Sequence, residues 1–328
     1  MLLRRLARRA PSSLVLGRGA PARAFADAPF DHVKTEREIG ELQRSVRDAL
    51  GAQDVATATA ASEALMALAR ESYGEERNPV LAAAYNDAAL CVKAAGDYEA
   101  AGLLLARSVQ AYETCGMGDH ASTATSLHNM GVCYKEHAAR PQIRGLERAA
   151  LLDRAAEALE ESVLRRERSA GFDAKRDAPA LATTQVIRAS VLRLSKKPDD
   201  AADVLDGAIS SLRVALAHTP VDTIRTALAA ALNNKALYAK HDGDADNAAG
   251  PLYAEALALR EAALGAAHPL VIQTLHNIAE HLDAAGDDDD ANGIREEILR
   301  RLDVDADDAD EAFAGAARAW AAKNAPPK

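Results

Sequence analysis

The sequence predicts an all-α fold in which antiparallel helix pairs stack into an α-solenoid. Aromatic residues make up only 4% of the chain while alanine and leucine are abundant, which favours close-packed helices over a β-sheet. Apolar residues recur at the three- and four-residue spacing of a helix. A set of landmarks also repeats along the chain, and such a repeat indicates stacked structural units.

The first landmark is a step that starts a helix, in most cases a residue followed by proline. These steps are Asn78-Pro79, His120-Ala121, Ala178-Pro179, His218-Thr219-Pro220 and His268-Pro269. A recurring slot follows each step, and a small residue lies two positions beyond it. The slot holds Asp87, Asn129, Ile187, Asn234 and Asn277, and the small residues are Ala89, Gly131, Ala189, Ala236 and Ala279. The fourth unit reaches its slot after about seven extra residues.

The second landmark is the turn inside each pair. Glycine followed by aspartate, at Gly96, Gly243 and Gly286, ends one helix and caps the next. A further small residue then marks the second helix of each pair. These residues are Ala101, Ala155, Ala201, Ala249 and Ala291. A single pair cannot bury its own apolar face, so the pairs must stack to bury it.

These landmarks divide the chain into a leader, a helix pair, five repeats and a C-terminal part. We expect a disordered leader at residues 1–25, a helix pair at 26–77, and a capping helix and tail at 303–328, where Phe313 and Trp320 cover the last repeat. The five repeats are expected at about 78–119, 120–177, 178–217, 218–267 and 268–302. An insertion near residues 138–150 lengthens the second repeat.

The fourth repeat carries a specific resemblance. Its pattern PLYxxALxLRExxLGxxHP, from Pro251 to Pro269, and its segment Leu232-Asn233-Asn234-x-Ala236 resemble the long tetratricopeptide (TPR) repeat of kinesin light chains. The resemblance covers about residues 78–302 and implies a right-handed TPR superhelix. The third repeat departs from the pattern, because Val186 and Ile187 replace the asparagine pair.

The resemblance also implies that the first helix of each pair lines a concave groove with two rows of ligand-facing positions. Asparagine in the first row offers a donor and an acceptor to the backbone of an extended peptide. Cations in the second row would attract an anionic peptide; alternatively, they offset helix dipoles, because they lie near helix C-termini. The first row is Asn86, His128, Val186, Asn233 and His276, and the second is Lys93, Lys135, Arg193, Lys240 and Asp283. The predicted groove residues are all of these except Val186 and Asp283.

No segment has the spacing of a catalytic or metal site. His276 and His281 lie five residues apart, whereas helical zinc motifs place two histidines on one face. Asp288 begins a segment similar to a calcium loop, but Leu299 stands where a glutamate is required. The sequence therefore predicts no catalytic residue, no metal site and no cofactor, and a protein that is not an enzyme. A metal-dependent enzyme or sensor on the solenoid is the alternative.

The leader, residues 1–25, contains six arginines and no acidic residue. This composition is typical of a mitochondrial transit peptide. We expect the protein in the mitochondrial matrix or on the matrix-facing inner membrane; a cytoplasmic protein with a disordered basic tail and a plastid protein are the alternatives. No uninterrupted apolar stretch of about 18 residues predicts an integral membrane span.

Charge bears on the class of partner. The net charge is −10 for the whole chain and −16 without the six arginines of the leader, which argues against nucleic acid. The expected function is a non-enzymatic scaffold or assembly factor that binds an extended acidic peptide segment of another protein. A TPR-type assembly factor of respiratory complex III and a kinesin-light-chain-like cargo adaptor are alternatives. Nothing in the sequence indicates an oligomeric state.

Overall fold

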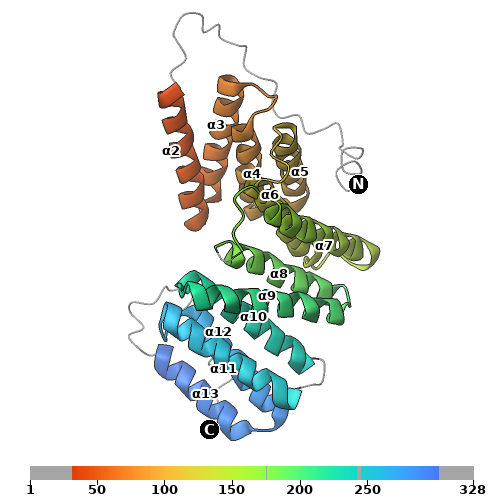
Figure 1. Cartoon of the computed structure of the whole chain (residues 1–328), viewed down its shortest axis with the longest axis vertical. Helices are drawn as coiled ribbons and strands as arrows, with labels where there is room; N and C mark the ends of the chain where they lie inside the picture. The colour runs from red at the N-terminus through yellow and green to blue at the C-terminus, as the bar shows by residue number, and fades with distance from the viewer. Residues whose placement is uncertain (1–31, 175, 242–244, 303–328) are drawn as a thin grey trace, which may run out of the picture. The chain divides into compact units, whose positions relative to one another are not determined.

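A computed structural model describes residues 32–174, 176–241 and 245–302, and in these residues the chain forms twelve α-helices (Figure 1). Successive helices pack as antiparallel pairs, which confirms the predicted all-α solenoid. The chain divides into two compact units, Met1–Phe172 and Asp173–Lys328. No helix among the described residues has the length and apolar character needed to cross a bilayer. The leader at 1–25 and the predicted capping helix at 303–328 lie outside the described residues.

The first unit contains three helix pairs. Its helices are α2 (His32–Gly51), α3 (Val55–Tyr73), α4 (Pro79–Ala94), α5 (Tyr98–Thr114), α6 (Ala121–Ala138) and α7 (Gly145–Glu167). The two helices of each pair pack together, and the second helix also packs against the first helix of the next pair. The first helices α2, α4 and α6 contact one another in succession, so they share one side of the unit. We call this side the first-helix face, and the side formed by α3, α5 and α7 the second-helix face.

The second unit repeats this arrangement. Its helices are α8 (Ala178–Leu194), α9 (Pro198–His218), α10 (Asp222–His241), α11 (Ala245–Leu264), α12 (Pro269–Ala285) and α13 (Asp288–Leu302). Here α8, α10 and α12 contact in succession and form the first-helix face. The largest core cluster of the unit is built from α8 to α11 and includes Leu205, Leu212 and Leu228.

The small residues that the sequence predicted at helix contacts are buried in every repeat. Gly131 of α6 shows why they must be small. A methyl group added there would lie 2.4 Å from Leu159 Cγ and 3.1 Å from the Ala155 carbonyl oxygen, both on α7. In the second unit, Ala236 of α10 forms a buried cluster with Ala249 and other residues of α11. Because the native side chains at these positions are small or absent, the two helices of a pair can approach closely.

Side chains of the step residues cap three of the first helices. Asn78 Oδ1 accepts a hydrogen bond from the Leu81 N–H at 2.9 Å, at the start of α4. His120 Nδ1 and His268 Nδ1 each accept from the N–H two residues later, at 3.1 and 3.2 Å, at the starts of α6 and α12. Helix starts leave N–H groups without partners inside the helix, and these caps supply acceptors. The His-Pro step of the sequence is therefore a helix cap.

The predicted Gly-Asp turns are present where the structure describes them. Gly96 has φ 90° and Asp97 Oδ1 accepts from the Ala100 N–H at 3.0 Å, so one helix ends and α5 begins within two residues. Gly286 is left-handed with φ 84° at the end of α12. Gly243, the third such glycine, lies outside the described residues.

Buried serines join the two helices of a pair, which the sequence analysis did not foresee. Ser108 of α5 donates its hydroxyl to the Ala82 carbonyl of α4 at 2.7 Å. Ser162 of α7 donates to the Ala124 carbonyl of α6, also at 2.7 Å. Both hydroxyls are buried, so these bonds satisfy polar groups that would otherwise be desolvated without a partner.

Helix length explains two irregular repeats. Helix α10 has 20 residues and α4 has 16, so the extra residues of the fourth repeat add about one turn to its first helix. The insertion predicted near residues 138–150 falls partly in the connection after α6 and partly in α7, which has 23 residues. Ile143 in that connection is buried and fixes it to the unit.

We predict that Gly131→Ala destabilises the protein although alanine is the better helix former. Its methyl group would meet Leu159 at a distance that forces a shift, and overpacking of this kind costs roughly 1–3 kcal/mol. Gly40→Ala in α2 is the matched control, because no atom lies within 4 Å of the added methyl group. Thermal unfolding should show a lower melting temperature for Gly131→Ala and an unchanged or higher one for Gly40→Ala. Equal behaviour of the two variants would contradict the close contact.

Candidate peptide-binding surface

The predicted groove residues all lie on first helices. In the first unit Asn86 and Lys93 belong to α4, and His128 and Lys135 to α6. In the second unit the helices are α8, α10 and α12, with the residues Arg193, Asn233, Lys240 and His276. The structure therefore places the predicted residues of each unit on the helices that form its first-helix face, where consecutive first helices contact one another.

An amide bridge joins neighbouring repeats in the first unit. Asn129 Nδ2 of α6 donates to Asn86 Oδ1 of α4 at 2.9 Å. The Asn86 amide nitrogen in turn lies 3.4 Å from Asp87 Oδ1. Burial raises the pKa of the Asp87 carboxyl, while Asn86 and the charge of Arg47 act in the opposite direction. Both the oxygen and the nitrogen of the Asn86 side-chain amide therefore already have partners within the chain.

The second unit has the same bridge. Asn277 Nδ2 of α12 donates to Asn233 Oδ1 of α10 at 3.0 Å, and Asn233 is buried. Asn129 and Asn277 were not among the predicted groove residues, although the sequence shows both in the recurring slot. The signal that could have identified them is the pair of polar residues, His-Asn or Asn-Asn, that ends in this slot.

The two lysines of the first unit have different surroundings. Lys93 Nζ lies 3.0 Å from Glu136 Oε1, so the cation on α4 is paired with an acid on α6. Lys135 is half-buried, and the residues that the structure describes supply it with no ion pair within 4 Å. Burial lowers the pKa of the Lys135 ammonium, and the charge of Glu136 partly offsets this. Glu136 pairs with Lys93 and only partly offsets the charge of Lys135, so the three side chains together carry a charge of +1.

His128 lies among these cations. Burial lowers the pKa of its imidazole, and the positive charges of Arg166 and Lys93 lower it further. Arg166 comes from the end of α7, where its Nη2 donates to Thr125 Oγ1 of α6 at 3.2 Å. His128 of α6 thus lies near cations from α4 and from the end of α7.

The cations of the second unit are arranged differently. The Arg193 guanidinium of α8 lies over the Tyr238 ring of α10, with its carbon 4.3 Å from the ring centroid, a cation–π contact that joins two repeats. The side chain of Lys240 lies outside the described part of the chain. Asp283, the acidic position in the second row, pairs with Arg295 of α13. Val186 packs against the hydrophobic core of the unit, as its apolar side chain requires.

The two segments that the sequence analysis considered as possible metal sites have structural roles. His276 Nε2 lies 3.4 Å from Glu280 Oε1, whereas His281 is buried beside the Tyr253 ring. Asp288–Leu302 is the helix α13, so its acids occupy a helix start. Among the described residues, no group of three or more His, Cys, Asp or Glu is placed to hold a metal ion. Burial raises the pKa of the Cys133 thiol to about 12, as expected for a packing residue.

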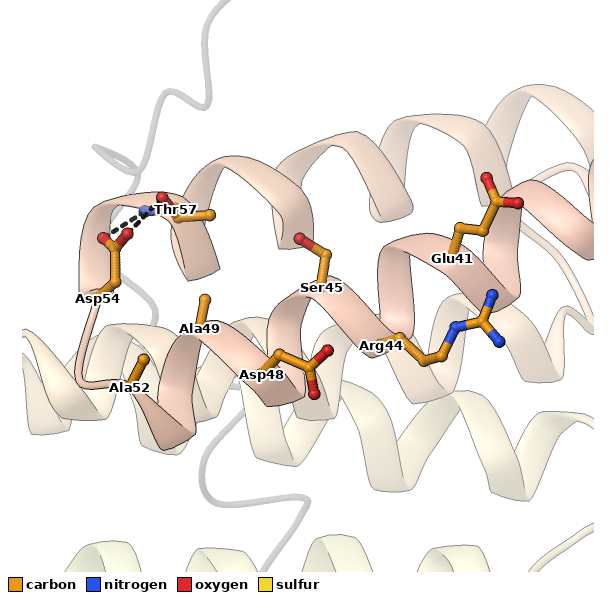
Figure 2. A pocket seen from close by; sticks show the side chains of 8 residues that line it. All are labelled: Glu41, Arg44, Ser45, Asp48, Ala49, Ala52, Asp54 and Thr57. Carbon is orange, nitrogen blue, oxygen red and sulfur yellow. Dashed lines mark hydrogen bonds between the residues drawn. The ribbon is translucent and has the colours of Figure 1, made fainter.

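A hollow of about 560 Å³ lies between α2 and α3 (Figure 2). Its polar end is a helix cap, in which Asp54 accepts from the Thr57 N–H at 3.0 Å and from the Thr57 hydroxyl at 2.6 Å. These hydrogen bonds lower the pKa of the Asp54 carboxyl. None of the predicted groove residues lines this hollow, which lies beside the turn between α2 and α3.

We predict that His128 makes stability depend on pH. The unfolded chain binds a proton near the usual histidine pKa of about 6.5, whereas the folded chain binds it only at lower pH. Stability is therefore lost as the pH falls from about 6.5 through the lower, folded value. Calorimetry should show a steeper fall in melting temperature for the wild type than for His128→Gln. His32→Gln, at an exposed position of α2, is the control, and identical slopes for all three proteins would contradict the prediction.

Comparison with known proteins identifies the fold. No protein-family model matches the chain, and no curated protein matches it. A crystal structure of a Podospora anserina protein described as a kinesin light chain with nearly identical TPR-like repeats matches with a TM-score of 0.53 and 17% identity, over 68% of this chain and 95% of that one. BtubC (BKLC) from P. vanneervenii matches with a TM-score of 0.51 and 18% identity, over 90% of this chain and 94% of its own.

A third match is the apo form of the quorum sensor NprR from B. thuringiensis. Its TM-score is 0.57 at 13% identity, and the match covers 89% of this chain and 71% of NprR. Identities this low show the fold alone. The chain has a TPR-like helical repeat fold that structurally resembles the repeats of kinesin light chains, a fold typical of protein-binding scaffolds and usually non-catalytic.

Proposed function

We propose that the protein is a non-enzymatic scaffold whose first-helix face binds an extended acidic peptide segment of another protein. The observation that carries this proposal is Lys135, a half-buried cation to which the described residues give no ion pair. A partly desolvated ammonium gains more from a carboxylate than a fully hydrated one does, because water screens the charge less. A glutamate or aspartate of a partner would supply that carboxylate.

The neighbours of Lys135 favour the same chemistry. Lys93, Lys135 and Glu136 together carry a charge of +1, so an incoming carboxylate meets a net positive cluster in a chain whose overall charge is negative. Burial and the neighbouring cations lower the pKa of His128, so its imidazole adds no negative charge that would repel the carboxylate. The lysines do more than offset the dipoles of their own helices, since Lys93 of α4 donates to Glu136 of α6 in the next repeat.

The sequence suggested that Asn86 and Asn233 bind the backbone of a peptide, but this proposal gives them a structural role. The oxygens of Asn86 and Asn233 already accept hydrogen bonds from the next repeat, so their first role is to hold the first helices side by side. Each such bond contributes about 0.5–1.5 kcal/mol. We assign peptide contact in the first unit mainly to the lysines.

We also propose that the protein acts in mitochondria, in the matrix or on the matrix-facing inner membrane. The support is compositional: residues 1–25 hold six arginines and no acid. Within that compartment, an assembly factor for a complex such as respiratory complex III is one role for such a scaffold. A cytoplasmic cargo adaptor of the kinesin-light-chain type is the second candidate, favoured only by the similarity of the repeats. Localisation separates the two candidates.

We predict that Lys135→Glu weakens binding of acidic peptides. An array of short peptides rich in Asp and Glu, each with an Asn/Gln counterpart, identifies binders, and fluorescence anisotropy then measures affinity. Reversing one charge should reduce affinity about three- to tenfold at low salt and less at high salt. Arg148→Glu, at an exposed position of α7, is the control. Equal affinity of the Lys135→Glu protein and the wild type at low salt would rule out this binding surface.

We predict that residues 1–25 carry a fused reporter protein into mitochondria. Import depends on positive charge, so changing Arg4, Arg5, Arg8 and Arg9 to glutamate should abolish it. Changing the same residues to lysine keeps the charge and is the control. A reporter that remains in the cytosol with the unaltered segment would favour the cytoplasmic alternative, and chloroplast uptake would favour the plastid one.

A further inference from the structure

Glu136 of α6 lies beside two lysines of the first-helix face. Its Oε1 accepts a hydrogen bond from Lys93 Nζ of α4 at 3.0 Å, and Lys135 precedes it in the chain. Consecutive residues of a helix point in directions about 100° apart and do not face each other. The carboxylate that faces Lys93 therefore makes no direct pair with Lys135, and its charge offsets the burial of that lysine only in part.

The two partners of the Lys93–Glu136 pair are unequally exposed. The Glu136 side chain is 41% exposed and the Lys93 side chain 22%, so the carboxylate can turn into water more readily than the ammonium can. Water and salt screen an ion pair at a surface, so opening this one costs little. The hydrogen bond between Asn129 of α6 and Asn86 of α4, about two turns earlier on both helices, still joins the repeats when the pair opens.

We propose that Glu136 is an internal competitor of the acidic peptide, which occupies Lys93 until a carboxylate of the partner replaces it. This inference rests on the proposed function. A first carboxylate of the partner binds Lys135, to which the described residues supply no ion pair, and displaces nothing. A second carboxylate binds Lys93 only by exchange with Glu136.

The competition defines the class of partner. A segment with one acidic residue gains one cation and leaves Glu136 in place, where its negative charge opposes the incoming carboxylate. A segment with several acidic residues gains both cations and releases Glu136 to water. The first-helix face therefore favours segments with several carboxylates over segments with one.

The proposal predicts a gain of affinity from the loss of a charged side chain. Glutamine at position 136 keeps the shape of glutamate and an oxygen that accepts a hydrogen bond from Lys93, but it carries no charge. Glu136→Gln therefore raises the charge of this group of side chains from +1 to +2 and leaves Lys93 without an acidic competitor.

The test uses the full-length chain and three short fluorescein-labelled peptides of equal length. In the first peptide aspartate alternates with serine; in the second, one aspartate remains and the others are asparagine; in the third, all are asparagine. Fluorescence anisotropy at low salt should show that Glu136→Gln binds the first peptide about three- to tenfold more tightly than the wild type does, with a smaller gain at high salt. The second peptide should gain less, and the third should bind neither protein.

Two further variants show how Glu136 acts. Glu63→Gln is the matched control, since Glu63 is an exposed glutamate of α3 in the same unit, and it should not change the affinity. In a Lys93→Gln protein the gain from Glu136→Gln should fall below about twofold, because no cation remains for Glu136 to occupy. Circular dichroism confirms that each variant is folded.

The outcomes separate this inference from the proposed function. Equal affinity of Glu136→Gln and the wild type for the first peptide, or an undiminished gain in the Lys93→Gln protein, overturns the inference; if Lys135→Glu still weakens binding, the proposed function stands without it. If the first peptide binds no better than the third to both the wild type and Glu136→Gln, the proposed function fails and this inference fails with it. Binding of the first peptide by Glu136→Gln alone supports both.

Discussion

The two helices of each pair approach one another at positions that hold only alanine or glycine, and the rest of the array depends on this contact. Where Gly131 meets Leu159, not even a methyl group fits without a shift. Close approach brings the buried serines of the second helices within hydrogen-bond distance of carbonyls on the first helices. It also fixes the rotation of each first helix, and that rotation decides which side chains reach the first-helix face.

On that face, contacts between repeats are mostly polar. Asparagine amides join α4 to α6 and α10 to α12, a lysine–glutamate pair joins α4 to α6, and an arginine–tyrosine contact joins α8 to α10. Polar side chains at a surface can exchange an intramolecular partner for a ligand at little cost, because water competes for both. The face therefore combines a stable backbone arrangement with polar side chains that suit the proposed contact with a peptide.

The sequence predicted what is local and repeated. The small residues, the steps that start helices and the Gly-Asp turns act within one pair, so spacing alone locates them. The pairing of Lys93 with Glu136 and of Asn86 with Asn129 joins residues 43 positions apart, and it depends on the rotation of two separate helices. The hollow between α2 and α3 was beyond prediction for another reason: it exists because side chains leave space unfilled, and no spacing of residue types indicates that.

Within each unit, the extensive helix contacts join only neighbouring or next-neighbouring helices. No contact of that size ties the first helix of a unit directly to its last. Such a chain can come apart one pair at a time from an end, since each step breaks a single interface and does not disrupt one central core. A motor pulling on one terminus through a narrow channel would therefore meet a series of small barriers instead of one large barrier. The same local connectivity lets each pair fold against its predecessor as soon as it emerges on the other side.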